Sequence, residues 1–401
     1  MEGAVENKNH TSNRYKSSTA AIAAVLLLIS VLFAGCAKEA QPESQVTVAA
    51  EETVETTAVQ ETNPVSNMKK VAMITDWGPA KNSYGNQACW QAIEKWCAEN
   101  GVDCVCYESE EDTTDERVLR VIQAITEGAD TVVLPGYLFG SVMVVVKDVY
   151  PDVKFLGIDV DAGDLTLDYE TVYEPTENMT CLTFCEEQMG YLAGYAAVRE
   201  GYRKLGYQGS LDVPAAVRSG YGFVQGADAA AAELGVKVEI NYAYSRQYFG
   251  NAALTSQLKQ WYADGTEVIF TSGGGIYTSA IEAAGEGGKV IGLEIDPAAV
   301  DDCVITSASK NLAAATSLAL QAIWDGGWED FGGKAVRLSL TDGDSLGLLT
   351  EETSWRLENF TVEDYLAVKG KIADGTISVK NSDDPSAKPE VSEFTKVNYL
   401  Q

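Results

Sequence analysis

Histidine is nearly missing from this chain of 401 residues, in which His10 is the only one. Ser-His-Asp and Cys-His catalysis both need an imidazole base, so these mechanisms are excluded for everything beyond residue 10. A mixed Cys/His zinc site is excluded for the same reason. Carboxylate and lysine chemistry stay open, but an enzyme becomes the minority hypothesis. We therefore expect no catalytic residue and no cofactor.

Basic residues are also few. The chain carries 29 Lys and Arg against 59 Asp and Glu, which gives a formal net charge of −30. Such a charge repels the phosphates of nucleic acids and of anionic lipids, so we expect no nucleic-acid partner. The eight cysteines include no Cys-x-x-Cys pair, and we expect buried thiols that behave as small hydrophobes rather than a metal site.

The longest mostly apolar run, Ala20–Phe33, is shorter than the ~20 residues that a membrane-spanning helix needs. It follows a basic segment with Arg14 and Lys16, and small residues lead from it to Cys36. This order is typical of a bacterial lipoprotein signal. Residues 1–35 are therefore predicted to be a signal peptide, and Cys36 to carry the lipid that anchors an extracytoplasmic protein to the cell membrane. An ordinary secretory peptide with a chance cysteine is the alternative.

Residues 36–67 contain few bulky apolar side chains. They consist almost entirely of Glu, Thr, Val, Ala, Gln, Ser and Pro, with six glutamates against one lysine. A segment of this composition buries too little apolar surface to offset the entropy lost on ordering, and its like charges extend it. We predict a disordered acidic tether.

The remaining residues, 69–401, are too many for one hydrophobic core and suit two lobes. Short β-rich runs alternate with helical runs, a pattern typical of parallel βαβ units. The expected strands are 71–75, 103–107, 131–135 and 154–159, then 207–213, 236–242, 267–272 and 289–294. The expected helices are 87–99, 115–127 and 138–149, then 187–200, 221–234, 252–263 and 277–284. The predicted fold class is α/β, with two doubly wound parallel-sheet lobes joined by a multi-strand hinge.

The chain is expected to pass between the lobes three times, near 173–186, 304–310 and 337–343. A further helix, Asn311–Trp324, completes the first lobe in this scheme. Lobe one then comprises residues 69–180 plus 306–337. Lobe two comprises residues 181–305 plus 338–401, including the C-terminal tail.

Ligands of doubly wound sheets bind beyond the carboxyl ends of the strands. The loop after the first expected strand carries Asp76 and Asn86, with Tyr84 at the start of a helix. A carboxylate, an amide and an aromatic ring suit a flat, polar ligand. We favour ligand contact by Asp76 and Asn86 over the alternative of a turn with a helix cap.

Two later strand ends supply the other candidates. Gly274 lies in a triple-glycine turn, which lets the backbone approach a ligand and present amides at a helix start. Glu294 ends a strand, and its carboxylate can accept hydrogen bonds from the vicinal hydroxyls of a sugar. Lys310 lies at the expected return to lobe one, where it can pair with Glu294 or donate to the same sugar. A solvated salt bridge is the alternative.

Several of these segments together resemble one known family. They are the lipobox, Ile74-Thr75-Asp76, Asn86-Gln87, Glu187–Ala197, Gly220–Gly226, the triple glycine, Ile291–Asp296 and Ser307–Lys310. The combination is similar to the basic membrane protein (Bmp) family, which includes the purine nucleoside receptor lipoproteins. Beyond the lipobox, which ends at Cys36, the resemblance runs from about residue 69 to 345. The resemblance implies a type I periplasmic-binding-protein fold. Such a protein captures a nucleoside between its lobes and delivers it to the permease subunits of an ABC importer. We expect a monomer.

The resemblance also implies roles for particular residues. The ribose would be held by Glu294, Gly274 and Lys310, and the nucleobase would stack between one aromatic ring from each lobe. Glu294 stands where the family has aspartate, which shifts the carboxylate by a methylene. The family's stacking phenylalanine aligns with Gly85, so Tyr84 is the candidate for lobe one. For lobe two, Tyr221 and Phe223 are both candidates.

Three alternatives stay open. The ligand of the binding protein can be a sugar or another small polar metabolite, because type I binding proteins share this architecture. A tethered sensory module would share it too. An extracytoplasmic oxidoreductase is the minority alternative, based on Gly220-x-Gly222-x3-Gly226, which has one residue too many for a dinucleotide fingerprint.

Overall fold

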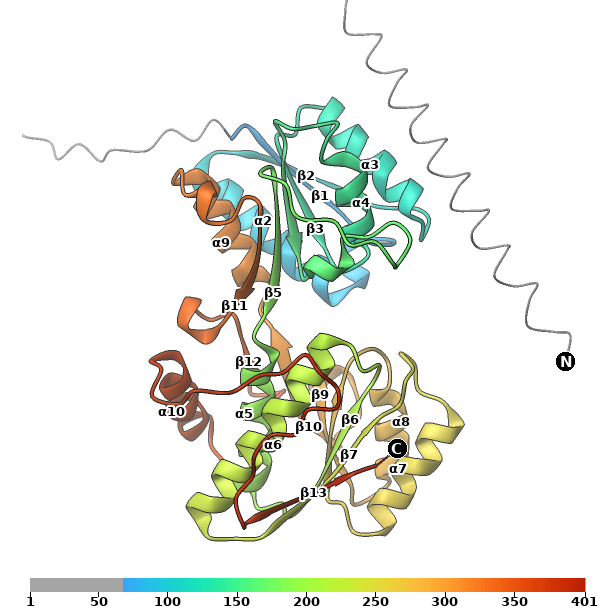
Figure 1. The fold of residues 1–401 in the computed structure, drawn as a ribbon, viewed down its shortest axis with the longest axis vertical. Helices are drawn as coiled ribbons and strands as arrows, with labels where there is room; N and C mark the ends of the chain where they lie inside the picture. Colours follow the sequence, from blue (N-terminus) through green and yellow to red (C-terminus); the bar gives the residue numbers. More distant parts are fainter. Residues whose placement is uncertain (1–67, 401) are drawn as a thin grey trace, which may run out of the picture.

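The computed structural model describes residues 68–400, which form two lobes that lie one above the other (Figure 1). The predicted signal peptide, the lipidation site Cys36 and the tether 36–67 lie outside the described residues. Within residues 68–400, every helix is too short or too polar to cross a bilayer.

Lobe one is built on a six-stranded parallel sheet with the strand order β11-β5-β4-β3-β1-β2. Helices α2 and α9 cover one face of it, and α3 and α4 cover the other (Figure 1). The strands are β1 (Lys70–Ile74), β2 (Asp103–Tyr107), β3 (Thr131–Pro135), β4 (Lys154–Ile158), β5 (Met179–Phe184) and β11 (Lys334–Leu338). The helices are α2 (Tyr84–Asn100), α3 (Thr114–Thr126), α4 (Phe139–Val146) and α9 (Leu312–Trp324), with short turns η1 (Ala80–Asn82), η2 (Ala162–Asp164) and η4 (Trp328–Asp330).

Lobe two contains a seven-stranded sheet with the order β12-β10-β9-β8-β6-β7-β13, in which only β12 is antiparallel to its neighbour. Its strands are β6 (Lys204–Gly209), β7 (Val238–Tyr244), β8 (Val268–Ser272), β9 (Lys289–Leu293), β10 (Val304–Lys310), β12 (Leu346–Leu348) and β13 (Thr395–Tyr399). Its helices are α5 (Glu186–Glu200), α6 (Pro214–Leu234), α7 (Ala252–Ala263), α8 (Tyr277–Ala284) and α10 (Val362–Ala373), with short turns η3 (Pro297–Ala299) and η5 (Leu340–Asp342). The predicted α/β fold of two doubly wound lobes is confirmed.

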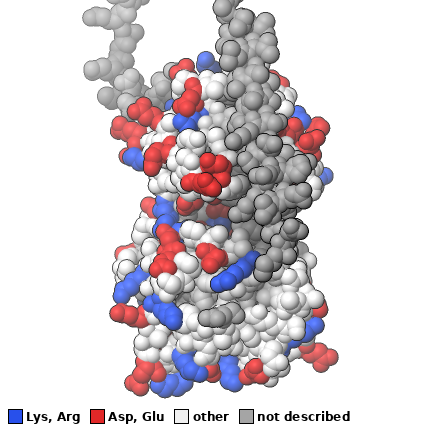
Figure 2. Space-filling view, turned by 45° about the vertical axis from the view of Figure 1, so that its right-hand side comes forward, with Lys and Arg blue, Asp and Glu red and all other residues white. Residues whose placement is uncertain are grey.

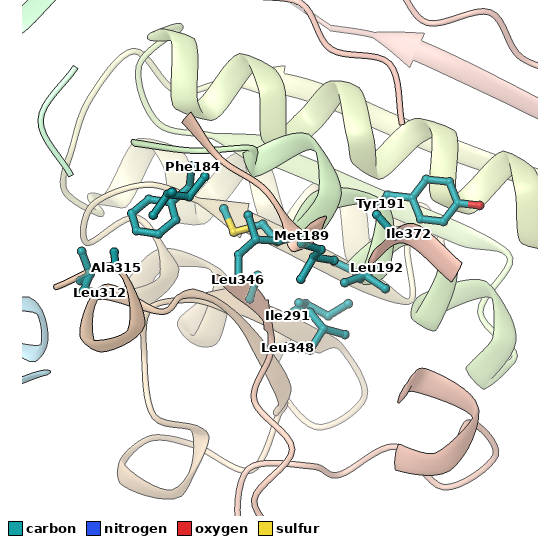
Figure 3. Close-up of a cluster of buried hydrophobic side chains, with 14 of the residues drawn as sticks. Phe184, Met189, Tyr191, Leu192, Ile291, Leu312, Ala315, Leu346, Leu348 and Ile372 are labelled. Carbon is teal, nitrogen blue, oxygen red and sulfur yellow. The ribbon is translucent and has the colours of Figure 1, made fainter. Parts of the chain in front are cut away.

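The hinge consists of three connections. The chain passes from β5 to α5, from β10 to α9 and from β11 to β12. Apolar side chains fill the space around these connections, so the core continues through the hinge (Figure 3). The expected lobe boundaries at 180/181 and 305/306 fall inside β5 and β10, because each strand stays in its own sheet until its ladder of hydrogen bonds ends.

Helices α5 and α6 pack against each other in direct backbone contact. A Cβ atom at Gly222 would overlap the carbonyl of Glu187, and one at Gly226 would overlap the carbonyl of Tyr191. Only glycine permits this approach, which gives the glycine spacing of α6 a packing role. Because these glycines lie inside a helix and not at a strand-to-helix turn, the dinucleotide-binding alternative loses its basis.

Helix α6 begins at Pro214 rather than at the expected Tyr221, and β6 ends at Gly209, before the expected Val213. Proline suits the first position of a helix, because its missing N–H would have no partner there. The elements that the periodicity does not predict are strands β5, β10, β11, β12 and β13 and helix α10. The C-terminal tail thus ends as an edge strand paired with β7.

Candidate functional site

A cleft of about 670 Å³ separates the lobes. Its lobe-one wall comes from the ends of β3, β4 and β5, and its lobe-two wall from the first turns of α5 and α6 and the ends of β6 to β10. These are the carboxyl ends of parallel strands, where ligands of doubly wound sheets bind. On the face shown in Figure 2, acidic and basic side chains are interspersed over both lobes.

The carboxyl end of β10 places Lys310 at the cleft, with only 10% of its side chain exposed. Its Nζ donates a hydrogen bond to Asp159 Oδ2 at 2.6 Å and lies 3.4 Å from Glu294 Oε1. Asp159 follows β4 in lobe one, whereas Glu294 follows β9 in lobe two. The lysine therefore joins carboxylates from both lobes. Sequence reasoning found Glu294 and Lys310 but not Asp159.

The positive charge of Lys310 and the negative charges of the nearby carboxylates stabilise each other. Burial alone would lower the pKa of the Lys310 ammonium, but the surrounding carboxylates, first of all Asp159, outweigh it, and the pKa of Lys310 lies above its ordinary value. Burial raises the pKa of the Glu294 carboxyl, and the positive charge of Lys310 opposes that rise. A charged lysine is thus held in the cleft at neutral pH.

Gly274 lines the same cleft, after β8. Its φ of 56° is in the left-handed region, and a Cβ atom would overlap the carbonyl of Tyr248. The neighbouring Gly275 N–H donates to that carbonyl at 2.6 Å. The triple-glycine turn therefore supports the loop that follows β7.

The structure brings Glu294, Lys310 and Gly274 together but places the two lobe-two aromatic candidates elsewhere. Phe223 is fully buried, with its ring centroid 6.0 Å from that of Tyr207 and 5.5 Å from that of Phe270. Tyr221 is not among the residues that line the cleft. Because α6 starts at Pro214, its first turn faces the cleft and these two aromatics lie further along the helix.

Other aromatic side chains line the cleft instead. Tyr137 follows β3 in lobe one, and Tyr248 and Phe249 follow β7 in lobe two. They are unusually accessible for their size, with 55% of Tyr137 and 78% of Phe249 exposed. Such exposure of aromatic rings beside a cleft is typical of ligand contact. The signal that could have found them is an aromatic residue just after each of two strands.

Asp76 and Asn86 of the first loop are not among the residues that line the cleft. Asn86 Nδ2 donates to Asp76 Oδ1 at 2.6 Å, and the N–H of Trp77 donates to the same oxygen at 2.7 Å. Asp76 and Asn86 thus hold the loop in shape, which is the turn alternative. Tyr84 is the first residue of α2. A Cβ atom at Gly85 would lie 3.4 Å from Leu312 Cδ1, so this position faces α9.

Asp164 and Glu186 are further acidic groups of the cleft that sequence reasoning did not find. Asp164 lines it after β4, and burial, reinforced by the charge of Asp161, raises the pKa of its carboxyl to about 6. Glu186 is buried at the start of α5 and accepts a hydrogen bond from Arg218 Nε at 2.6 Å. Arg218 Nη1 also donates to Asp383 at 2.6 Å. These residues lie in turns and helix starts, where no spacing marks them.

The family model described as "ABC transporter substrate-binding protein PnrA-like" (Bmp) matches residues 69–383. The chain belongs to this family. Basic membrane protein B of Borreliella burgdorferi is 29% identical over 227 residues, which are 54% of this chain and 62% of that protein. The ABC transporter nucleoside-binding protein BmpA of Lactococcus lactis is 24% identical over 221 residues, which are 54% of this chain and 58% of that protein. The matched part thus spans about three fifths of these Bmp relatives.

Solved structures support the fold of this Bmp-family chain. A solute-binding protein of an ABC transporter system from Aeropyrum pernix K1 is similar with a TM-score of 0.55 and 21% identity, over 79% of this chain and 94% of that one. A similar protein from Conexibacter woesei gives a TM-score of 0.58, also at 21% identity, over 78% of this chain and 99% of that one. The expected fold of periplasmic binding proteins is confirmed.

Proposed function

We propose that this Bmp-family chain is the substrate-binding protein of an ABC importer and captures a nucleoside between its lobes. The observation that carries the proposal is the arrangement of the cleft. Lys310, Glu294 and Gly274 offer polar groups from strand ends, and aromatic rings of both lobes line the same cavity. A nucleoside presents the matching pair of surfaces, a ribose with vicinal hydroxyls and a flat base.

The mechanism is hinge closure. The open protein exposes two half-sites, and a ligand that contacts both lobes favours the closed state by its greater affinity for that state. In the closed state, Glu294 accepts from a ribose hydroxyl and Lys310 donates to a ribose oxygen. Tyr137 of lobe one and either Tyr248 or Phe249 of lobe two supply the stacking rings, the latter in place of Tyr221 and Phe223. Stacking and a few hydrogen bonds can reach micromolar affinity, about −8 kcal/mol.

The proposal extends to location and partners. A lipid on Cys36 would hold the protein outside the cell membrane, and residues 36–67 would let the two lobes reach the permease subunits. The family's description as ABC transporter substrate-binding proteins supports the permease partners, and the nucleoside-binding name of the Lactococcus lactis relative supports the ligand.

A thermal-shift screen of the purified, ligand-free chain tests the function. The panel contains adenosine, guanosine, inosine and uridine, together with hypoxanthine, ribose and common sugars. We expect a rise of several degrees in Tm with a nucleoside and a much smaller rise with ribose or the free base, because each of these fills only half of the site. No rise with any nucleoside would contradict the proposal.

A sugar or another small polar metabolite is the second candidate. It is favoured by the loop of Asp76, Asn86 and Gly85, which lies off the cleft and provides no stacking ring at the position where the family has one. Carboxylates with aromatic platforms also suit sugars. A rise in Tm with a sugar alone, in protein shown to be ligand-free, would select this candidate.

A further inference from the structure

The two lobes share a short repeated segment at the cleft. Lobe one contains Leu-Gly-Ile-Asp-Val-Asp at 156–161, and lobe two contains Ile-Gly-Leu-Glu-Ile-Asp at 291–296. The first segment contains the end of β4 and the second contains the end of β9. Counted along the chain, each of these is the fourth strand of its lobe. The sheets also share the order β5-β4-β3-β1-β2 in lobe one and β10-β9-β8-β6-β7 in lobe two. Asp159 and Glu294 therefore occupy equivalent places.

The backbone at the two acids is equivalent as well. Asp159 has a φ of 60° and Glu294 a φ of 54°, in the left-handed region that residues other than glycine seldom adopt. The backbone N–H of Asp159 donates a hydrogen bond to the carbonyl oxygen of Leu182 in β5. The backbone N–H of Glu294 donates in the same way to the carbonyl oxygen of Ala308 in β10, and both distances are 2.8 Å. Strained backbone that recurs at equivalent points of a cleft indicates a functional constraint on both side chains.

Both side chains turn toward Lys310, but they share it unequally. Asp159 accepts the lysine's hydrogen bond at 2.6 Å, whereas Glu294 Oε1 lies 3.4 Å away in an ion pair without hydrogen-bond geometry. Among the described residues, no donor forms a hydrogen bond with this buried oxygen. The third carboxylate that acts on Lys310, that of Glu186, is already paired with Arg218. A buried oxygen without a donor is costly unless a ligand supplies one.

We propose that Asp159 is the lobe-one counterpart of Glu294 and acts as a positioning residue, which holds the Lys310 ammonium so that Glu294 Oε1 stays free to accept a hydroxyl of the ligand. The inference rests on the proposed function for the nature of that ligand. Because Asp159 and Lys310 belong to different lobes, their hydrogen bond also holds the lobes together at the place where the ligand is bound. Without Asp159, Lys310 would turn to Glu294 and occupy the oxygen that the ligand needs.

The test compares Asp159→Asn with Asp148→Asn in the full chain. Asp148 lies on the same lobe, pairs only with the neighbouring Lys147 in the described structure and is exposed away from the cleft. Titration calorimetry with inosine, guanosine and adenosine measures affinity. Competitive labelling of amines across a pH series, read by mass spectrometry, measures how readily Lys310 loses its proton. Asp159→Gly is the second variant, because glycine adopts the left-handed backbone without strain and keeps the loop folded.

We expect Asp159→Asn and Asp159→Gly to weaken nucleoside binding at least tenfold and to make Lys310 reactive at a lower pH. Asp148→Asn should change neither property by more than twofold. Reduced affinity with unchanged Lys310 labelling would overturn the positioning role, and so would unchanged affinity in both Asp159 variants.

The labelling of Lys310 is measured without a ligand, so a failure of this inference can be distinguished from a failure of the proposed function. If wild-type protein binds no nucleoside, the proposed function fails. In that case unchanged Lys310 labelling in the Asp159 variants would overturn the inference as well. Labelling of Lys310 at a lower pH than in wild type would uphold the pairing of Asp159 with Lys310.

Discussion

At the scale of single residues, the cleft depends on the buried cation that links the two lobes, Lys310. Lys310 neutralises part of the repulsion between Asp159 and Glu294, which come from different lobes. Removing one partner of a buried ionic group leaves an uncompensated charge, which costs about 3–5 kcal/mol, whereas an exposed pair contributes about 0–1 kcal/mol. The lysine is therefore expected to matter for both stability and binding.

Lys310→Met tests this directly. We expect a lower Tm and at least a tenfold loss of nucleoside affinity, because two carboxylates are left facing each other and a donor is lost. Lys259→Met is the matched control, since Lys259 forms an exposed ion pair with Glu282 on the outside of lobe two. Equal effects of the two substitutions on affinity would contradict the site.

Asp164 gives the chain a pH dependence with a definite sign. Its pKa is raised to about 6 from an ordinary value of 3.8, first of all by burial. A carboxyl whose pKa is raised on folding stabilises the folded state at acid pH, and this contribution is lost as the pH rises through about 6. At neutral pH the ionised group therefore destabilises the chain, by up to about 2 kcal/mol after allowance for its partial exposure.

Asp164→Asn should remove this destabilisation at neutral pH. The asparagine keeps a side-chain oxygen that can accept the hydrogen bond from the backbone N–H of Asp161. We expect the variant to have a higher Tm than wild type at pH 7.5 and an equal Tm near pH 3.5. Thermal unfolding followed by circular dichroism at a series of pH values measures the difference. A Tm difference that does not change with pH would contradict the raised pKa.

At the scale of elements, the contact between α5 and α6 is the most demanding. Four glycines, two on each helix, let the backbones touch, and a Cβ atom at any of them would overlap a carbonyl of the other helix. They are Gly190, Gly194, Gly222 and Gly226. The first turns of both helices line the cleft, so this packing also positions Glu186 and Arg218.

Gly222→Ala should therefore destabilise the chain by several kcal/mol, because the helices must move apart. Gly370→Ala in α10 is the matched control. Its Cβ atom would meet open space, so the loss of glycine should stabilise that helix by about 0.5–1 kcal/mol. Urea unfolding of both variants compares the two, and a destabilised Gly370→Ala or a neutral Gly222→Ala would contradict the packing argument.

At the scale of the whole molecule, closure of two lobes predicts protection on both sides of the cleft. We expect a bound nucleoside to slow hydrogen exchange in the loop around Tyr137 of lobe one and in the loop of Tyr248 and Phe249 of lobe two. The outer helix α7 is the internal control and should not change. Mass spectrometry of peptides measures the exchange. Protection confined to one lobe would contradict hinge closure.

Much of the architecture could be predicted because the periodic pattern of apolar residues, which distinguishes strands from helices, depends only on neighbouring positions in the sequence. The alternation of strands and helices and the division into two lobes are confirmed, and the family pattern extends over most of the chain. Polar residues and glycines at the ends of strands can also be recognised in the sequence, which is why Gly274, Glu294 and Lys310 could be predicted. Asp159 carries the same pattern in lobe one, and comparing the two lobes could have found it.

The aromatic residues show where local reasoning stops. Tyr221 and Phe223 lie in a helix whose start depends on Pro214, and one helix position decides whether a ring faces the cleft or the core. The helix begins at Pro214, so Tyr221 and Phe223 lie beyond its first turn, and Phe223 packs in the core. Tyr248 and Phe249 line the cleft from a different segment, the loop after β7.

The sequence by itself determined the fold class, the order of the elements and the polar groups at strand ends, because these follow from patterns within a few neighbouring residues. Only the tertiary structure decided which side chains meet. The pairing of Lys310 with Asp159 spans 151 positions and two lobes, and that of Arg218 with Asp383 spans 165. Such contacts depend on how the hinge and the sheets place distant segments, which no local pattern encodes.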